Sequence, residues 1–334
     1  MLDEKAARAP GVSSGAMSPL PALEEAGRAD EAAFAQRIAE LGALIARHAP
    51  GDGRHETRVP GVAAVRRNQP QPACDHVLHK PAVCVIAQGA KEITLGDEVY
   101  AYDSTRLMVL ALDLPVKGQV VQASPARPYL CVRVEIDPAE VAALLLRMPA
   151  RALGNEAPAR ALYLSRTSLP MLDAMVRLLR AADDPDEAAL LGPLAVQEIL
   201  YRLLASEHGA RIAHVARPDT AAHRIARVID RLKTDFAAPV RIDELASLVH
   251  MSASSLHHHF RAVTALSPLQ YQKQLRLQEA RRLLLGGRLE VASVAHRVGY
   301  ESASQFSRDY SRHFGAAPSR ELQRLRQVAE TAAA

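Results

Sequence analysis

The chain has 334 residues, of which 49% are hydrophobic, 23% charged and 4% aromatic. This length allows two or three domains, and this hydrophobic fraction excludes a fully disordered chain. Because there is no run of ~18 apolar residues and no apolar core near the N-terminus, we expect neither a membrane span nor a secretory signal. Three scattered cysteines are too few for a disulfide framework and favour a reducing, cytoplasmic location.

The net charge of +4 is unevenly distributed along the chain. Residues 221–326 contain 17 Lys and Arg against 9 Asp and Glu, whereas residues 1–220 contain 24 against 27. A basic C-terminal third on a mildly acidic remainder favours nucleic-acid binding by one domain. Charge alone leaves open a second interpretation, in which the arginines only cover solvated helices.

The first half of the chain changes from an unpatterned segment to a β-rich one. Residues 1–28 are rich in Ala, Gly, Ser and Pro, which predicts a disordered tail. Apolar residues recur at helical spacing from Asp30, and short β runs separated by turns follow over residues 57–136. The expected strands are Val83–Ile86, a hairpin of Lys91–Leu95 and Glu98–Tyr102, Arg106–Ala111, Gly118–Gln122 and Tyr129–Ile136.

Helical patterns return after the strands. One helix is expected from Asp137, and two more over residues 168–208, joined by a loop at 183–186. We therefore predict an α+β protein whose residues 29–210 form an antiparallel β sandwich or small barrel with flanking helices. Residues 211–220 are expected to be a linker, with Thr220 as the N-cap of the next helix.

The C-terminal third contains an internal repeat with an offset of about 50 residues. Residues 245–252 and 294–302 each predict a short apolar helix, a tight turn and a polar start of a second helix. The aligned positions are Leu256 with Phe306, Phe260 with Tyr310, and Pro268 with Pro318. This pattern is typical of two helix-turn-helix units, although a generic helical bundle is the alternative.

The two predicted units have features suited to the major groove of DNA. Each turn needs a residue that tolerates left-handed geometry, for which Gly299 is ideal and His250 is weaker. A connecting helix over residues 268–285 would span roughly 25–27 Å, which can hold the units near one DNA turn apart. The second helices present polar and small residues that can contact bases and phosphates, namely Ser254, His257, His258 and Arg261, and Ala303, Ser304, Ser307 and Arg308.

On these residues the C-terminal third resembles the DNA-binding domain of AraC-type (AraC/XylS) transcriptional regulators over its full length. The matching segments are Ile242–Leu248, Ser254–Phe260, Ser267–Tyr271, Arg276–Leu284 and a pattern running from Val294 to Pro318. Two departures are His250, in place of a small turn residue, and Ala303, which can touch only a thymine methyl group. Residues 55–210 resemble the N-terminal domain of one branch of that family through Val83–Lys91, Leu95–Asp97, Tyr100–Asp103, Asp113–Val116 and Ser124–Leu130.

The resemblance implies a regulator rather than an enzyme. It implies a cupin-like domain over residues 29–210 that binds an unknown small-molecule effector and forms a homodimer, with helices of residues 168–208 as candidates for the contact. It further implies a double helix-turn-helix domain over residues 221–326, which binds double-stranded DNA, followed by a tail at 327–334. RNA polymerase is an implied partner, and neither a cofactor nor a membrane is expected.

Two groups of histidines invite a metal-binding interpretation. His257, His258 and His259 are consecutive, so on a helix they point ~100° apart and cannot bind one ion together. His76 and His79, with Asp75, have a suitable local spacing on an expected loop. The ligand pattern of a metal-dependent cupin is absent, however, so an ordinary polar loop is favoured.

Cys84 lies inside an apolar β run and has two interpretations. It is either a buried small hydrophobe or a thiol of the effector pocket that senses an electrophile or oxidant, which would need exposure and thiolate character.

The sequence leaves three functions to compare. The first is a sequence-specific transcription regulator. The second is a cupin-type enzyme fused to a helical domain, although no GxSxG, P-loop, GxGxxG or HExxH motif is present. The third is an architectural DNA binder without an effector.

Overall fold

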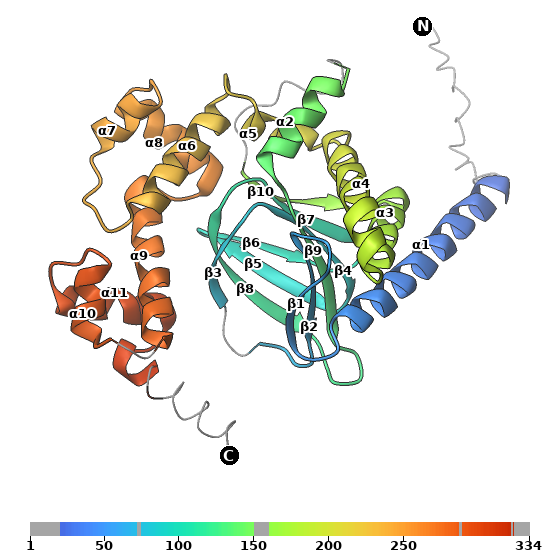
Figure 1. Ribbon diagram of the computed structural model, residues 1–334, viewed down its shortest axis with the longest axis horizontal. Helices are drawn as coiled ribbons and strands as arrows, with labels where there is room; N and C mark the ends of the chain where they lie inside the picture. The colour runs from blue at the N-terminus through green and yellow to red at the C-terminus, as the bar shows by residue number, and fades with distance from the viewer. Residues whose placement is uncertain (1–20, 72–74, 150–159, 287–288, 322, 324–334) are drawn as a thin grey trace, which may run out of the picture.

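The computed structural model describes residues 21–71, 75–149, 160–286, 289–321 and 323. A β sandwich with flanking helices occupies the N-terminal part, and the C-terminal third is all helical (Figure 1). This confirms the predicted α+β fold class with a helical C-terminal domain. The expected tail at 327–334 and residues 1–20 lie outside the described residues.

The sandwich consists of two antiparallel sheets. The six-stranded sheet has the order β1-β2-β9-β4-β7-β10, and the four-stranded sheet has the order β3-β8-β5-β6. The strands of the first sheet are β1 (Gly53–Glu56), β2 (Val62–Arg67), β4 (Ala82–Gln88), β7 (Arg106–Leu110), β9 (Tyr129–Glu135) and β10 (Leu162–Arg166). Those of the second are β3 (Asp75–His79), β5 (Ala90–Leu95), β6 (Glu98–Tyr102) and β8 (Leu114–Gln122).

The sequence patterns located most of these strands. The predicted hairpin is the β5–β6 pair, with Leu95 opposite Glu98 across the Gly96-Asp97 turn. Strand β8 begins four residues before the expected Gly118. Strands β1, β2, β3 and β10 were not predicted individually. Strands β1 and β3 lack an apolar run, β2 contains two alanines, which are depleted in strands, and β10 follows a helix. Asp75–His79, expected to be a loop, is strand β3 because it pairs with β8.

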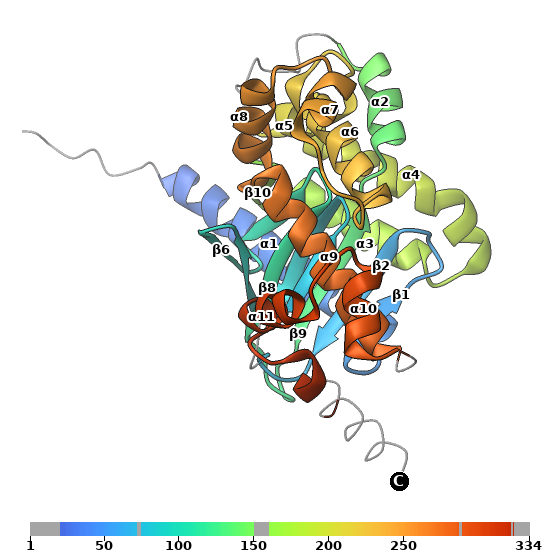
Figure 2. The same cartoon turned by 90° about the vertical axis from the view of Figure 1, so that its left-hand side faces the viewer.

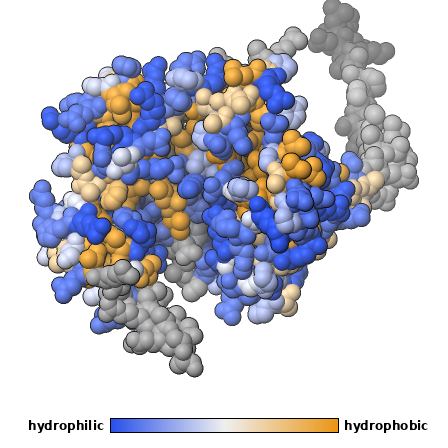
Figure 3. Space-filling view, in the orientation of Figure 1, coloured by the Kyte–Doolittle hydropathy of each residue, from blue (hydrophilic) through white to orange (hydrophobic). Residues whose placement is uncertain are grey.

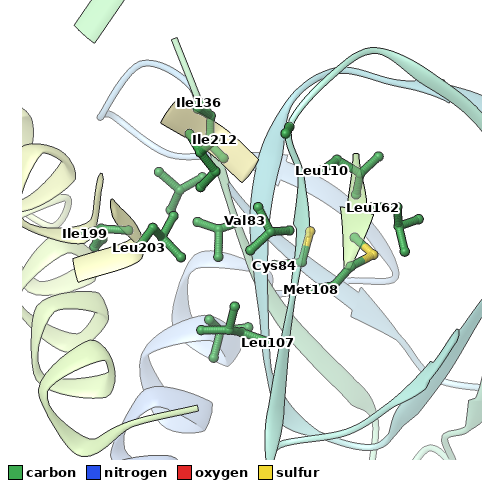
Figure 4. Packing of buried hydrophobic residues seen from close by; sticks show 14 of the residues in the cluster. Val83, Cys84, Leu107, Met108, Leu110, Ile136, Leu162, Ile199, Leu203 and Ile212 are labelled. Atoms are coloured by element: carbon green, nitrogen blue, oxygen red, sulfur yellow. The ribbon is translucent and has the colours of Figure 1, made fainter. Parts of the chain in front are cut away.

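Helices cover the outer face of the six-stranded sheet. They are α1 (Pro21–His48), α2 (Pro138–Arg147), α3 (Leu169–Ala181), α4 (Pro185–Leu204) and α5 (Gly209–Ala216). Because side chains alternate along a strand, Val83 points toward Ile199 and Leu203 of α4, whereas Cys84 points to the other side with Met108 (Figure 4). The sheet therefore has two buried faces, one against the helices and one inside the sandwich.

Two segments differ from the expected secondary structure. Helix α1 begins at Pro21, so residues 21–28 of the expected disordered tail are helical. These residues have good helix formers but no apolar stripe, and periodicity alone does not detect such a segment. Most of α5 falls within residues 211–220, which were expected to be a linker. The domain boundaries themselves stay a prediction.

The described residues of the C-terminal third form helices from Ala221 to Phe314. They are α6 (Ala221–Thr234), α7 (Ile242–Leu248), α8 (Ala253–Thr264), α9 (Pro268–Leu285), α10 (Val291–Arg297) and α11 (Ala303–Phe314). One buried hydrophobic cluster runs from the sandwich through α6 and α8 to Leu275 of α9, and a second one starts at Leu277 and includes α10 and α11. The first helical unit therefore shares its core with the N-terminal part, whereas the second has a core of its own.

Within the described residues, no single helix is long and apolar enough to cross a membrane. Helices α4 and α5, bent by 110° at their junction, meet that test of length and composition only as a pair.

Candidate nucleic-acid interface

The first helix-turn-helix unit consists of α7 and α8. Between them His250 adopts the left-handed conformation, with a φ of 53°, as the turn requires. The Ser252 hydroxyl accepts a hydrogen bond from the backbone N–H of Ser255 (3.2 Å) and so caps the start of α8. Leu256 and Phe260 are fully buried, so the opposite face of α8 points outward.

The second unit consists of α10 and α11 and repeats this construction. Gly299 has a φ of 87°, and a Cβ added there would lie 2.1 Å from the carbonyl oxygen of Ala237, so no other residue fits. Ser302 caps α11 as Ser252 caps α8. Phe306 and Tyr310 are buried, as predicted from their alignment with Leu256 and Phe260.

Helix α9 joins the two units and confirms the predicted connecting helix. Its 18 residues start at a capping box formed by Ser267 and Gln270, and give a length of about 27 Å. In Figure 2, α8 and α11 lie on the same side of α9, and α7 and α10 on the other. The second helices of the two units therefore lie toward the same edge of this view, near the two ends of α9.

The Arg276 guanidinium holds α9 against the segment before the first unit. It donates hydrogen bonds to the carbonyl of Phe236 (2.8 Å), to those of Ala237 and Ala238, and to that of Gly299 in the turn of the second unit (2.9 Å). A single side chain thus links the turn of the second unit to the end of α6.

The sequence-predicted contact residues lie on the outward faces of α8 and α11. Arg261 and Arg308 are exposed and able to reach a phosphate or a base edge. Exposed with them are Ser254, His257, His258 and Ser304, while Ala303 and Ser307 are half-buried. None of the eight side chains is buried against the rest of the chain. Contact of these residues with DNA stays a proposal.

The three consecutive histidines separate as helical geometry requires. His257 and His258 are exposed, whereas His259 is half-buried, and burial lowers the pKa of its ring. His76 and His79 lie three positions apart on strand β3, so they point to opposite faces of the sheet. Among the described residues, no group of three or more His, Cys, Asp and Glu is placed to hold a metal ion.

No sequence pattern indicates the contacts between the helical third and the sandwich. Arg160 donates hydrogen bonds to the carbonyls of Arg261 (2.7 Å) and Ala262 (2.6 Å) at the end of α8. Glu98 of β6 accepts from the same guanidinium (2.7 Å), which together with the Tyr100 hydroxyl holds the pKa of Glu98 below its usual range. No local pattern could have revealed this pairing, because Arg160 and Arg261 are 101 positions apart.

A second contact between the sandwich and the helical third lies at the other end of the helical third. Nδ1 of His76 on β3 and Nε2 of His313 on α11 are 2.9 Å apart, and the His76 ring also packs against Phe314. Figure 3 shows hydrophilic residues over most of the outer surface and hydrophobic ones gathered along the junction between the two parts. The sandwich therefore contacts both α8 and α11 near their C-terminal ends.

Cys84 lies on β4 with its side chain inside the sandwich and an exposed fraction of 6%. The structure thus places Cys84 among the buried residues. A sensor role stays a prediction, because it needs access that burial restricts.

Comparisons with known proteins divide the chain in the same way as the fold. Residues 58–211 match the family model of the AraC-type transcriptional regulator N-terminus, and residues 245–324 match a helix-turn-helix domain. Together the two matches support the predicted resemblance to AraC-type transcriptional regulators, including the N-terminal domain that its β-rich segments predict.

Two curated relatives and one solved structure illustrate the similarity. The RCS-specific HTH-type transcriptional activator RclR of Escherichia coli is 39% identical over 88 residues, which cover 26% of this chain and 31% of RclR. The activator RhaR of Pectobacterium atrosepticum is 34% identical over 107 residues, covering 32% and 38%. An apo ToxT variant from Vibrio cholerae shares the fold with a TM-score of 0.55 and 13% identity, covering 81% of this chain and 100% of ToxT. The chain thus spans about a third of the length of RclR and of RhaR.

Proposed function

We propose that this protein is a sequence-specific DNA-binding transcription regulator whose helices α8 and α11 enter successive major grooves. A small-molecule effector bound by the N-terminal part controls this binding. The main support is that α8 and α11, whose outward residues are exposed or half-buried, lie near the two ends of α9. The 18 residues of α9 give a length of about 27 Å, which is near the ~34 Å of one helical turn of DNA. The basic charge of residues 221–326 supplies the attraction to phosphates.

A shift assay with the purified full chain tests this function. A fragment from upstream of a neighbouring operon is expected to bind with nanomolar affinity, and a footprint should show two protected segments one helical turn apart. Raising the salt concentration should weaken binding steeply. Equal affinity for unrelated DNA would favour the architectural function instead, and no binding to any genomic fragment would contradict the proposal.

The effector is proposed to bind between the two parts of the molecule. A cavity of about 610 Å³ lies where the sandwich, α2 and α4 meet α6, and its lining includes Lys80, Asp113 and Lys233. A ligand there contacts both parts, so it can have different affinities for two arrangements of them, which effector control requires. Pro193→Trp at the exposed rim is expected to abolish the response of a promoter reporter to its inducer and to leave DNA affinity unchanged. An undiminished response would place the effector elsewhere.

A homodimer is proposed through α4. Leu190, Leu194 and Tyr201 lie on its exposed side at near-helical spacing, with exposed fractions of 72%, 62% and 50%. The same face on a second copy would cover these side chains across a two-fold axis. In sedimentation experiments, Leu190→Glu combined with Leu194→Glu should convert a dimer to a folded monomer. A wild-type monomer at micromolar concentration would contradict this proposal. RNA polymerase remains a further proposed partner of the DNA-bound form.

A further inference from the structure

Two of the three cysteines meet inside the sandwich, although they are 47 positions apart in sequence. In the register of β4 and β9, Cys84 lies opposite Arg133 and Ile86 lies opposite Cys131, so the two cysteines are diagonal neighbours on one face of the sheet. Both are buried, with exposed fractions of 6% and 3%. The Cys131 thiol donates to the carbonyl of Val132 (3.5 Å), and each of the two thiols affects the pKa of the other.

The surroundings of the pair distinguish the two sulfurs. The interaction with the Cys131 thiol, aided by the positive charges of Arg133, Lys91 and Arg54, lowers the pKa of the Cys84 thiol although burial opposes this. The same interaction, together with burial, raises the pKa of Cys131. Cys84 is therefore the sulfur that ionises first, and Cys131 stays protonated beside it.

A second observation comes from Arg133, directly opposite Cys84 in the sheet. Its side chain is buried, and its two terminal nitrogens bind Glu135 Oε1 (2.8 Å) and the carbonyl of Lys80 (3.1 Å). Its Nε has no hydrogen-bond partner among the described residues. A buried cation with a free N–H next to a thiol is an arrangement that stabilises a thiolate.

We propose that Cys84 and Cys131 form a reversible dithiol–disulfide site that reacts with hydrogen peroxide. The Cys84 thiolate attacks one peroxide oxygen, the O–O bond breaks, and the leaving hydroxide takes up a proton to become water. The sulfur of Cys131 then attacks the resulting sulfenic acid; the S–S bond forms, the S–O bond breaks, and a second water leaves with the proton of Cys131. Two thiols are oxidised and one peroxide is reduced to two waters.

The burial and the geometry of the pair define the kind of site. Only a small oxidant reaches sulfurs this buried, through local opening of the sandwich. Diagonal positions on neighbouring strands are further apart than a relaxed disulfide prefers, so closing the bond pulls β4 toward β9 next to the irregularity between Ile86 and Gln88. Strained disulfides are the easily reduced ones, which suits a switch that resets.

Thiol counting on the full chain tests the proposal. The reduced native protein is treated with hydrogen peroxide, then denatured and alkylated with a maleimide of known mass. Wild type should lose two of its three alkylatable thiols, dithiothreitol should restore both, and mass spectrometry should find a peptide linked through Cys84 and Cys131. Retention of all three thiols, or a linkage that includes Cys74, would overturn the proposal.

Three variants make the test specific. Cys74→Ser should still lose two thiols, which leaves none to alkylate. Cys131→Ser should form no disulfide but accumulate a sulfenic acid at Cys84 that dimedone traps, and Cys84→Ser should show neither product. Each variant is first checked by circular dichroism; Cys→Ala replaces any Cys→Ser variant that fails to fold. Dimedone labelling of Cys131 in place of Cys84 would reverse the assigned roles and contradict the mechanism. The site does not depend on DNA binding, so loss of one proposal leaves the other standing.

Discussion

The Tyr271 hydroxyl on α9 donates a hydrogen bond to the backbone carbonyl of Asp113 in the sandwich, 2.8 Å away and 158 positions earlier in the chain. The carboxylate of the same Asp113 forms an ion pair with Lys233 of α6, with 2.9 Å between Oδ2 and Nζ. The segment between β7 and β8 therefore holds both the helix that enters the first unit and the helix that links the two units.

Tyr271→Phe removes this hydrogen bond and keeps the buried ring. We expect the free energy of unfolding to fall by about 1–2 kcal/mol, because the Asp113 carbonyl loses its partner. Hydrogen exchange should become faster in β8 and α9. Tyr310→Phe is the control, since its hydroxyl binds Glu321 within the helical third. Equally accelerated hydrogen exchange of β8 in both variants would show that the Tyr271 contact does not join the helical third to the sandwich.

Ala265→Gly is expected to stabilise the protein by roughly 0.5–1 kcal/mol. Ala265 ends α8 in the left-handed conformation, with a φ of 62°, where the second unit has Gly315 with a φ of 79°. Glycine avoids the cost of a Cβ in that conformation, and part of the gain is offset by the greater freedom of the unfolded chain. Urea denaturation measures the change. Ala262→Gly, one turn earlier inside α8, should instead destabilise by about 1 kcal/mol.

Arg276→Met is expected to lower the free energy of unfolding by about 3 kcal/mol. The substitution keeps an apolar stem but leaves several carbonyls without their charged donor. Arg282→Met on the same helix is the control, because Arg282 is exposed and forms an ion pair with Glu279 of its own turn. A loss of similar size in both variants would mean that the carbonyl contacts of Arg276 add nothing to stability.

The contact between His76 and His313 predicts a pH dependence. Burial, the neighbouring His76 and the charges of Lys117, Arg281 and Lys273 lower the pKa of His313 to about 3. An unfolded histidine titrates near ~6.5. Between these values the unfolded state binds more protons, so this contribution is complete above pH ~6.5 and decreases as the pH falls toward 3.

His313→Gln tests this sign, because glutamine does not titrate. The melting temperature should fall less between pH 7.5 and 5 in the variant than in wild type. His257→Gln on the exposed face of α8 should leave the wild-type slope unchanged. A variant with the full wild-type slope would mean that His313 does not contribute to it.

Arg308→Ala is expected to weaken DNA binding. If Arg308 reads a base, the loss is about 1–3 kcal/mol and is confined to one half of the site. If it contacts a phosphate, affinity falls for all sequences and the salt dependence decreases by about one unit of slope. Arg180→Ala on α3, which pairs with Glu40 in the N-terminal part, should bind DNA like wild type. Unchanged binding by Arg308→Ala would exclude α11 as a reading helix.

Local patterns were sufficient for most elements of this fold. The αL turn at Gly299, the cap at Thr220 and the hairpin around Gly96 depend on residues next to each other in sequence, and each was predicted. The polar strands β1 and β3 were not, because their position depends on pairing with distant strands.

The eight predicted contact residues are on outward helix faces because the repeat specifies which positions are buried. The repeat could not place Arg160 at the end of α8 or Cys131 beside Cys84. Those contacts follow from strand order and register, which no local pattern contains.

By itself, the sequence determined that two similar helical units follow a β-rich domain, because helix periodicity, turns and caps depend on near neighbours along the chain. Only the tertiary structure decided that the first unit shares a hydrophobic core with the sandwich and that two buried cysteines are diagonal neighbours on adjacent strands. The reason is physical: contacts between residues a hundred positions apart depend on how whole sheets and helices pack, and the same local pattern is compatible with many such packings.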